Sequence, residues 1–367
     1  MFNIALGIFL FLSPILFLPL TIPGIATLQW HQFGFFTNDV EVVQRQIFMY
    51  GIVLLMISAL FDNPKRLFGD NWMRWLLLVC FFCTYAHPMT VKIFPTVFLG
   101  FLLYYLVSVC VDVKSIQYFF LVIFAVSLVN LLFSILQIFN IHFLMFKDHE
   151  IIGLMGYKTQ LGIYQAIAIP ICYALNPWAS IVPILGLILS SSGTATVAGV
   201  LGCIYFLWKR GVRIGSVLIW QVILVVSGFY IYGHFDKLNI RLDAWRYALG
   251  ESFHHIFNGN GVGLFHYANL HGGQQSSYAD PYSIYLEVFY SFGIFGFITF
   301  TAFLIEKLWR FKGRNLTEQA LYASCLILVI SGIGYSFMDY PRLAGTAIII
   351  FGLLTAIRQE RKTIHVT

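Results

Sequence analysis

Two arginines begin a stretch of the chain that is rich in groups able to bind anions and move protons. The stretch, residues 241–283, reads RLDAWRYALGESFHHIFNGNGVGLFHYANLHGGQQSSYADPYS. Arg241 and Arg246 could grip an anionic group on a lipid-borne substrate, because the planar guanidinium forms paired hydrogen bonds with phosphate oxygens. The alternative is that each side chain extends to the lipid headgroups of a membrane surface.

Two acids and two histidines in or near this stretch are candidates for accepting a proton. Asp280 precedes an apolar run, and Glu287 lies further inside it. An acid that enters a membrane is costly to bury and is a candidate for function, although Asp280 could instead cap a helix. His266 and His271 could act as a general base near neutral pH, or they could be ordinary surface histidines. The spacing of the histidines does not predict a metal site.

A glycine-rich segment, NGNGVGLF, follows the arginines. Gly259, Gly261 and Gly263 permit positive φ angles and a close approach of the backbone. Because no strand is predicted before it, the segment is not a dinucleotide-binding fingerprint. It predicts a tight turn at the membrane surface, or a turn that shapes a cleft for a pyrophosphate or a sugar.

Two further cations fall on the same predicted side of the membrane. Lys158 starts a predicted helix in GLMGYKTQLG, and Arg342 lies in MDYPRLAG beside Asp339. Lys158 could join Arg241 at an anionic group or anchor to headgroups. Arg342 could do the same or form a local ion pair with Asp339, which would contribute little to stability.

The elements that must position these groups are membrane-spanning helices. The 367 residues are 59% hydrophobic and only 10% charged, with a mean hydropathy of +0.81. Soluble proteins carry about 25% charged residues, so the composition predicts an all-α polytopic membrane protein. The predicted helices are 4–22, 46–61, 75–87, 93–111, 116–138, 160–175, 179–190, 194–208, 214–233, 282–306, 318–337 and 343–357.

The distribution of basic residues predicts an orientation. Residues 181–208 could form one long helix, but two helices place KRGVR on the same side as most other basic loops. That arrangement predicts both termini inside the cell and one large outer loop, residues 234–281, within a single membrane domain of residues 1–367. The net charge of +6 is then a feature of membrane topology and predicts no binding of nucleic acid.

The polar part of this outer loop is predicted to begin with an amphipathic helix, LDAWRYALGESFHHI. At about 100° per residue, its apolar side chains fall on one stripe suited to a membrane surface. The stripe consists of Leu242, Trp245, Leu249, Phe253 and Ile256.

These motifs together resemble the O-antigen ligase/polymerase superfamily of bacterial membrane glycosyltransferases. That family typically shows Arg-x-x-x-Trp, then a GxGxGxF-like turn, then Pro-His-Asn-x-Tyr-Leu and Gly-x-x-Gly. The matching residues here are Arg241, Trp245, Gly259, Gly261, Gly263, Phe265, Pro281, Tyr285, Leu286, Gly293 and Gly296. Two elements depart from the family. Its His-Asn pair falls on Tyr282 and Ser283, and its Ser-Arg-Gly appears as SSSGTA without the arginine.

The resemblance implies a GT-C-like fold with about 12 transmembrane helices in the bacterial inner membrane and an active site that faces the periplasm. It implies transfer of a glycan from undecaprenyl diphosphate to an acceptor glycan, with no metal or other cofactor. Diphosphate binding would fall to Arg241, Arg246, Lys158 and Arg342, and proton transfer to Asp280, Glu287, His266 or His271. The departures favour a polysaccharide polymerase over a ligase that transfers the glycan to lipid A core or to a protein such as a pilin. A polysaccharide-lipid flippase or secondary transporter is the alternative from another class.

Overall fold

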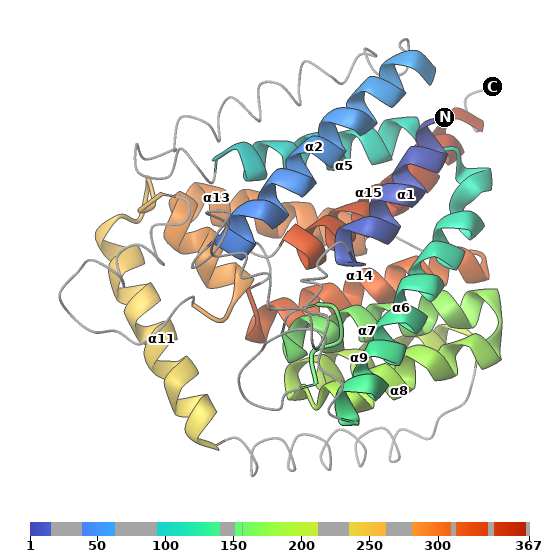
Figure 1. The fold of residues 1–367 in the computed structure, drawn as a ribbon. Coiled ribbons are helices and arrows are strands. Elements are labelled where there is room, and N and C mark those ends of the chain that lie inside the picture. The colour runs from blue at the N-terminus through green and yellow to red at the C-terminus, as the bar shows by residue number, and fades with distance from the viewer. Residues whose placement is uncertain are drawn as a thin grey trace, which may run out of the picture.

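The computed structural model describes residues 1–15, 39–62, 94–139, 151–155, 157–211, 235–261, 281–309, 313–336 and 341–364. Every regular element in these ranges is a helix (Figure 1). The α-helices are α1 (Phe2–Ile15), α2 (Asp39–Asp62), α5 (Phe94–Cys110), α6 (Ile116–Ile138), α7 (Lys158–Leu175), α8 (Ile181–Ser190), α9 (Gly193–Lys209), α11 (Phe235–His254), α13 (Ile284–Trp309), α14 (Leu316–Gly334) and α15 (Pro341–Ile364). Two short 3-10 helices, η3 (Val113–Ser115) and η4 (Pro177–Ser180), precede α6 and α8. Over the described ranges the prediction of an all-α chain is confirmed.

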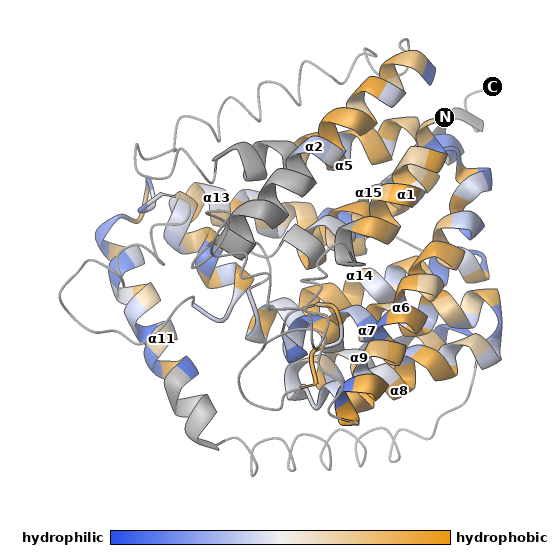
Figure 2. Ribbon diagram, in the orientation of Figure 1, coloured by the Kyte–Doolittle hydropathy of each residue, from blue (hydrophilic) through white to orange (hydrophobic). Residues whose placement is uncertain are grey.

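Four of the described helical segments are long and apolar enough to cross a membrane. They are Val113–Ile138, Ile284–Trp309, Leu316–Gly334 and Leu343–Glu360. Most helices of the bundle are rich in hydrophobic residues, whereas α11 carries many hydrophilic ones (Figure 2). The predicted membrane class agrees with these helices, and the number of twelve spans stays a prediction. The helices predicted at 75–87 and 214–233 lie outside the described residues.

Helices α7, α9 and α14 pack closely along lines of small residues. Gly199 of α9 faces Ala166 of α7, and a Cβ there would lie 3.1 Å from that of Ala166. A Cβ at Gly202 would clash with Ile327 of α14. Small residues at such contacts let helix backbones approach one another where lipid gives no hydrophobic drive for association. The three helices therefore form a tight core that fixes the positions of their ends.

The chain reverses direction within SSSGTA, as the distribution of basic residues predicts. Helix α8 ends at Ser190, α9 begins at Gly193, and Ser191 between them has a left-handed φ of 48°. Gly162 near the start of α7 lies against this reversal, because a Cβ there would be 2.7 Å from Ser190 Oγ. Two separate helices over residues 181–208 are thus confirmed, and the reversal lies at the same end of the bundle as the start of α7.

Helix α1 begins and α15 ends at one end of the bundle, which we call the terminal end (Figure 1). The amino group of Met1 lies 3.1 Å from Asp62 Oδ2 at the end of α2. Asn3 donates a hydrogen bond of 3.1 Å to Ser115 before α6. The starts of α7, α9 and α13 lie at the opposite end, and α11 runs across that end (Figure 1).

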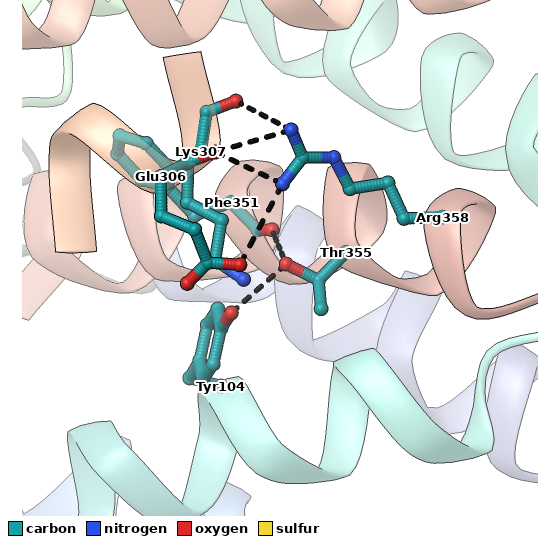
Figure 3. Close-up of polar contacts among 6 residues, drawn as sticks. All are labelled: Tyr104, Glu306, Lys307, Phe351, Thr355 and Arg358. Atoms are coloured by element: carbon teal, nitrogen blue, oxygen red, sulfur yellow. Dashed lines mark hydrogen bonds and ion pairs between the residues drawn. The ribbon is translucent and has the colours of Figure 1, made fainter. Parts of the chain in front are cut away.

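A polar cluster joins α5, α13 and α15 at the terminal end (Figure 3). Arg358 donates hydrogen bonds of 3.1 Å to the carbonyl of Glu306 and 3.3 Å to that of Lys307. These carbonyls close the last turn of α13 and would otherwise lack helical donors. The hydroxyls of Tyr104 and Thr355 lie 2.8 Å apart. The cluster fixes the ends of three helices and plays no part in the candidate site at the opposite end.

Two buried amide side chains of α6 hold the segment that leads into α7. Gln137 Oε1 accepts hydrogen bonds of 3.0 Å from the N–H groups of Ile152 and Gly153. Asn130 Oδ1 accepts a hydrogen bond of 3.0 Å from the N–H of Leu154. Because buried backbone N–H groups are costly to leave unpaired, these contacts fix the segment and with it the start of α7.

Candidate functional site

Helix α11 packs against α13 through a face of small side chains. Ala244, Ala248 and Ser252, each four residues from the next, are buried on that face. The predicted helix is confirmed, and it begins at Phe235 rather than Leu242. Along the predicted apolar stripe, Leu242 is 37% exposed and Phe253 is 62% exposed. The stripe therefore points away from the protein core over much of its length, in keeping with the prediction of a helix at a membrane surface.

Arg241 of α11 reaches the start of α9. Its Nη1 donates a hydrogen bond of 3.2 Å to Thr194 Oγ1. Its guanidinium carbon lies 5.8 Å from the ring centroid of Tyr282, which precedes α13. A Cβ at Gly334, the last residue of α14, would lie 3.6 Å from the same Nη1. Arg241 is thus half-buried where four segments of the chain meet, rather than extended towards solvent.

The start of α9 adds partial positive charge beside Arg241. The N-cap residue, Ser192, makes no side-chain capping hydrogen bond. The first N–H groups of a helix have no acceptor within the helix, and they carry the positive end of its dipole. Arg241 and this helix start together form an arrangement that suits an anion such as a phosphate.

Two buried polar atoms near these elements have no hydrogen-bond partner among the described residues. One is Trp245 Nε1, which lies one turn along α11 from Arg241 on the same side of the helix. The other is Ser336 Oγ, two residues beyond the end of α14. Buried polar atoms usually have a hydrogen-bond partner. Two such atoms without a partner are therefore typical of a place where water or a ligand binds.

The start of α7 is tied to the residue that follows α14. Gln160 Nε2 donates a hydrogen bond of 3.2 Å to the hydroxyl of Tyr335, and both side chains are buried. Lys158, two residues earlier, is the first residue of α7 and is half-buried. Lys158 therefore lies at the end of the bundle that carries Arg241, as predicted from its sequence position.

Helix α13 begins with a short segment that carries Glu287. Glu287 lies in the first turn and is only 8% exposed. The helix breaks at Gly293, whose φ of 65° and ψ of −163° are not helical. The prediction of one continuous span from residue 282 thus needs a correction, because the chain forms two helical segments with the break between them. The first segment places a buried carboxylate at the same end of the bundle as Arg241.

The glycine-rich segment closes tightly on this break. The N–H of Asn260 donates a hydrogen bond of 2.7 Å to the carbonyl of Tyr290. The N–H of Ile294 donates a second one, also of 2.7 Å, to the carbonyl of Ile256. Gly259 has a φ of 66°, and a Cβ there would clash with the backbone of Ser291. The predicted tight turn is confirmed for its described part, and it locks α11 to the break in α13.

The remaining predicted residues are placed less closely or lie outside the described part. The Arg246 side chain is 80% exposed and pairs with Asp243 over 3.2 Å, an exposed contact that adds little stability. Arg342 belongs to the first turn of α15, but its side chain is outside the described residues. Asp280, His266 and His271 also lie outside them.

One tyrosine beside Arg246 has a shifted pKa. Burial, and then the negative charge of Glu251, raise the pKa of Tyr247 above its usual value. Its hydroxyl therefore stays protonated at neutral pH and can act as a hydrogen-bond donor. Among the described residues no group of three or more His, Cys, Asp or Glu side chains could hold a metal ion.

Thr194, Gln160, Tyr335 and Gly334 contribute to this site without having been predicted. Only Thr194 carries a signal in the sequence, since it lies in the polar SSSGTAT segment between two apolar runs. The other three lie at helix ends, and their roles depend on which helices meet.

Comparison with known proteins adds no relative. No family model matches the chain, and no curated protein is significantly similar to it. The resemblance to the O-antigen ligase/polymerase superfamily therefore rests on the motifs themselves.

Proposed function

We propose that this protein is a membrane glycosyltransferase that transfers undecaprenyl-diphosphate-linked oligosaccharide units at the periplasmic face of the bacterial inner membrane. The observation that carries the proposal is the position of Arg241, half-buried at the start of α9 beside Thr194. An arginine next to a helix start is suited to a diphosphate, which is the leaving group of such a donor.

The proposed reaction depends on positive charge beside the diphosphate leaving group. As the glycosidic bond to the diphosphate breaks, negative charge grows on the leaving oxygen, and fixed donors stabilise it. Arg241 and the N–H groups at the start of α9 supply these donors, with Lys158 as the next cation at the same end. Arg246 and Arg342 remain candidates for the distal phosphate. The acceptor hydroxyl attacks the anomeric carbon from the opposite face, which inverts its configuration.

A base must take the proton of the acceptor hydroxyl. Of the four candidates, Glu287 is the one whose side chain lies in the described part of the structure. It is buried at the start of α13, five residues after the tyrosine that lies under Arg241. Asp280, His266 and His271 are the other candidates. The histidine of the family's Pro-His-Asn motif is replaced by Tyr282 in this chain. In this proposal the base therefore comes from another position.

The arginine that the resemblance implies in SSSGTA is missing here, whereas Arg241 matches the family's Arg-x-x-x-Trp arginine. Its hydrogen bond goes to Thr194, a residue of that same segment. A cation therefore still reaches the reversal between α8 and α9, although it comes from α11. The missing arginine and the missing His-Asn pair suit a divergent member of the superfamily, for which we favour a polysaccharide polymerase over a ligase acting on lipid A core or a protein.

The distribution of cations supports the proposed orientation. At the terminal end the cations whose side chains are described are Lys114, Lys209, Arg210, Lys307, Arg314 and Arg358. By the same criterion, the opposite end carries Lys158, Arg241 and Arg246. Basic residues are enriched on the cytoplasmic side of membrane proteins, so the terminal end would face the cytoplasm.

A transporter or lipid flippase is the second candidate, and the break in α13 favours it. Transporters often place ionisable residues at interrupted helices, as Glu287 is placed before Gly293. The two candidates differ in their products. A transferase changes the length or the anchor of a glycan, whereas a transporter changes only the side of the membrane on which a lipid-linked unit lies.

The test is the surface-glycan profile of cells that lack this gene. The cells are complemented at matched expression with the wild type, Arg241→Ala, Glu287→Gln or the control Lys114→Ala, an exposed cation at the terminal end. We expect wild type and Lys114→Ala to restore long chains, while Arg241→Ala leaves single units on their normal anchor. Removal of one such donor costs roughly 100-fold in rate.

Other outcomes discriminate between the alternatives. Full-length glycan that accumulates on its lipid carrier would support a ligase. Single units trapped on the cytoplasmic face would support a flippase. Full activity of Arg241→Ala would show that Arg241 is only a headgroup anchor and would contradict the proposed site.

A further inference from the structure

Three tryptophans at the terminal end are largely exposed. Trp178 of η4 is 78% exposed, Trp208 of α9 is 62% exposed, and Trp309 at the end of α13 is 86% exposed. Tryptophan is enriched at the boundary between lipid and water, because its ring is apolar and its N–H is polar.

Two cations lie on aromatic rings beside Trp208. Lys209 Nζ lies 5.0 Å from the ring centroid of Trp208 and 5.7 Å from that of Tyr205. The guanidinium carbon of Arg210 lies 6.0 Å from the ring of Tyr173 on α7. These cation–π contacts hold both side chains over apolar rings at the end of α9.

Neither cation has an acidic partner in the part of the chain that the structure describes. The ion pairs found there join Asp62, Asp243 and Glu306 to other groups. Both Lys209 and Arg210 are exposed, and the chain turns away at Gly211, whose φ is 75°. The ring contacts satisfy the cations only in part, so each remains able to bind a phosphate oxygen.

An aromatic bridge connects this surface to the end of α13. The ring centroids of Tyr205 and Tyr322 lie 5.0 Å apart. The Tyr322 hydroxyl donates a hydrogen bond of 2.9 Å to the carbonyl of Leu308. Trp309 follows Leu308, so its exposed ring starts from the same level of the bundle as Trp208. The aromatic side chains of α7, α9, α13 and α14 thus form one connected band on this part of the terminal end.

We propose that the terminal end binds the headgroups of anionic phospholipids at a patch formed by Trp208, Lys209 and Arg210. The tryptophan lies at the lipid boundary, and the two cations bind the phosphate group. The occupant is a bilayer lipid rather than a soluble anion, because the patch belongs to the aromatic band of a protein with membrane-spanning helices. The proposal does not depend on the glycosyltransferase activity.

Lipid binding by the full-length protein tests this patch. Wild type, Lys209→Gln/Arg210→Gln and the control Lys114→Gln are purified in detergent and titrated with phosphatidylglycerol or phosphatidylcholine. Bound lipids are counted by native mass spectrometry. Lys114 is an exposed cation at the same end with no aromatic ring beneath it among the described contacts. Equal melting temperatures establish that all three proteins are folded.

We expect the wild type and Lys114→Gln to prefer phosphatidylglycerol. The double variant should bind it roughly thirtyfold more weakly, as expected from losing two cations near an anionic surface. The charge-preserving variant Lys209→Arg/Arg210→Lys should retain most of the preference. The proposal is overturned if the double variant keeps the wild-type preference, or if the wild type does not distinguish the two lipids.

Discussion

The guanidinium of Arg241 and the hydroxyl of Thr194 form a hydrogen bond of 3.2 Å between residues 47 positions apart in the chain. The contact joins a hydrophilic helix that crosses the end of the bundle to the first turn of a buried helix. It matters because it fixes a half-buried arginine at a place where helix N–H groups also point outwards. The side chain is therefore already positioned before any anion binds.

Replacement of Thr194 tests this positioning. Thr194→Val keeps the β-branched shape but removes the acceptor for Arg241, so we expect the transfer rate to fall roughly three- to tenfold, the usual size of one lost hydrogen bond. Thr194→Ser keeps the hydroxyl and should stay near wild type. The measurement is the initial rate of glycan transfer by purified protein in liposomes. A rate for Thr194→Val equal to that of wild type would mean that the hydrogen bond does not position Arg241.

Tyr282 provides a separate test of the same arginine. Its ring lies under the guanidinium, and its backbone has a left-handed φ of 48° that is unfavourable for a tyrosine. Tyr282→Phe should retain activity, because the ring face remains. Tyr282→Asn accommodates the backbone angle but removes the ring, and it should lower the rate roughly two- to thirtyfold, the range of a cation–π contact.

The two Tyr282 variants also separate a chemical role from a positional one. If Tyr282→Phe is as inactive as Tyr282→Asn, the hydroxyl takes part in the reaction. The melting temperature of each variant serves as the control for folding.

The turn between α11 and α13 predicts a large difference between two glycine substitutions. A Cβ at Gly293 would lie 2.7 Å from the carbonyl oxygens of Ile256 and Phe257, at a φ of 65°. Gly293→Ala should therefore destabilise the protein by about 1–3 kcal/mol and lower its melting temperature. Gly250 lies within α11 with no atom within 4 Å of its would-be Cβ. Gly250→Ala should be neutral or raise stability by up to about 1 kcal/mol. Equal melting temperatures for the two variants would contradict the tight turn.

Burial of Gln137 gives a prediction for the segment that leads into α7. Gln137→Leu removes the acceptor for two backbone N–H groups, so we expect a loss of about 1–3 kcal/mol in the free energy of unfolding. The control is Gln117→Leu, an exposed glutamine of the same helix, which should have a small effect. Thermal unfolding in detergent measures both. A small change for Gln137→Leu would show that water replaces the lost acceptor.

The orientation is tested by labelling single cysteines in intact cells. A background without the six native cysteines receives one of two new cysteines. They are Tyr157→Cys, which is 52% exposed at the end of the bundle that carries Arg241, and Lys114→Cys, which is exposed at the terminal end. A membrane-impermeant maleimide should label the first in intact cells and the second only after lysis. The reverse pattern would place the candidate site in the cytoplasm and exclude a periplasmic transferase.

Much of the fold can be predicted because local sequence determines helix formation. Apolar runs of bilayer length indicate α6, α14 and α15, and the polar SSSGTA between two apolar runs marks the reversal before α9. The glycines of NGNGVG mark a turn because positive φ is costly for other residues. The spacing of apolar residues and the composition do not predict the break in α13, because its apolar character continues through Gly293.

The candidate site itself is only partly contained in the sequence. Arg241, Lys158 and Glu287 are site candidates from the sequence because they are charged. Charged groups are costly near a membrane and need partners. The sequence alone determined that this is a helical, membrane-type chain with its polar chemistry gathered around one late loop. Only the tertiary structure decided that Arg241 meets Thr194 and Gly334, because that contact depends on how α11, α9 and α14 pack and not on the spacing of residues within any of them.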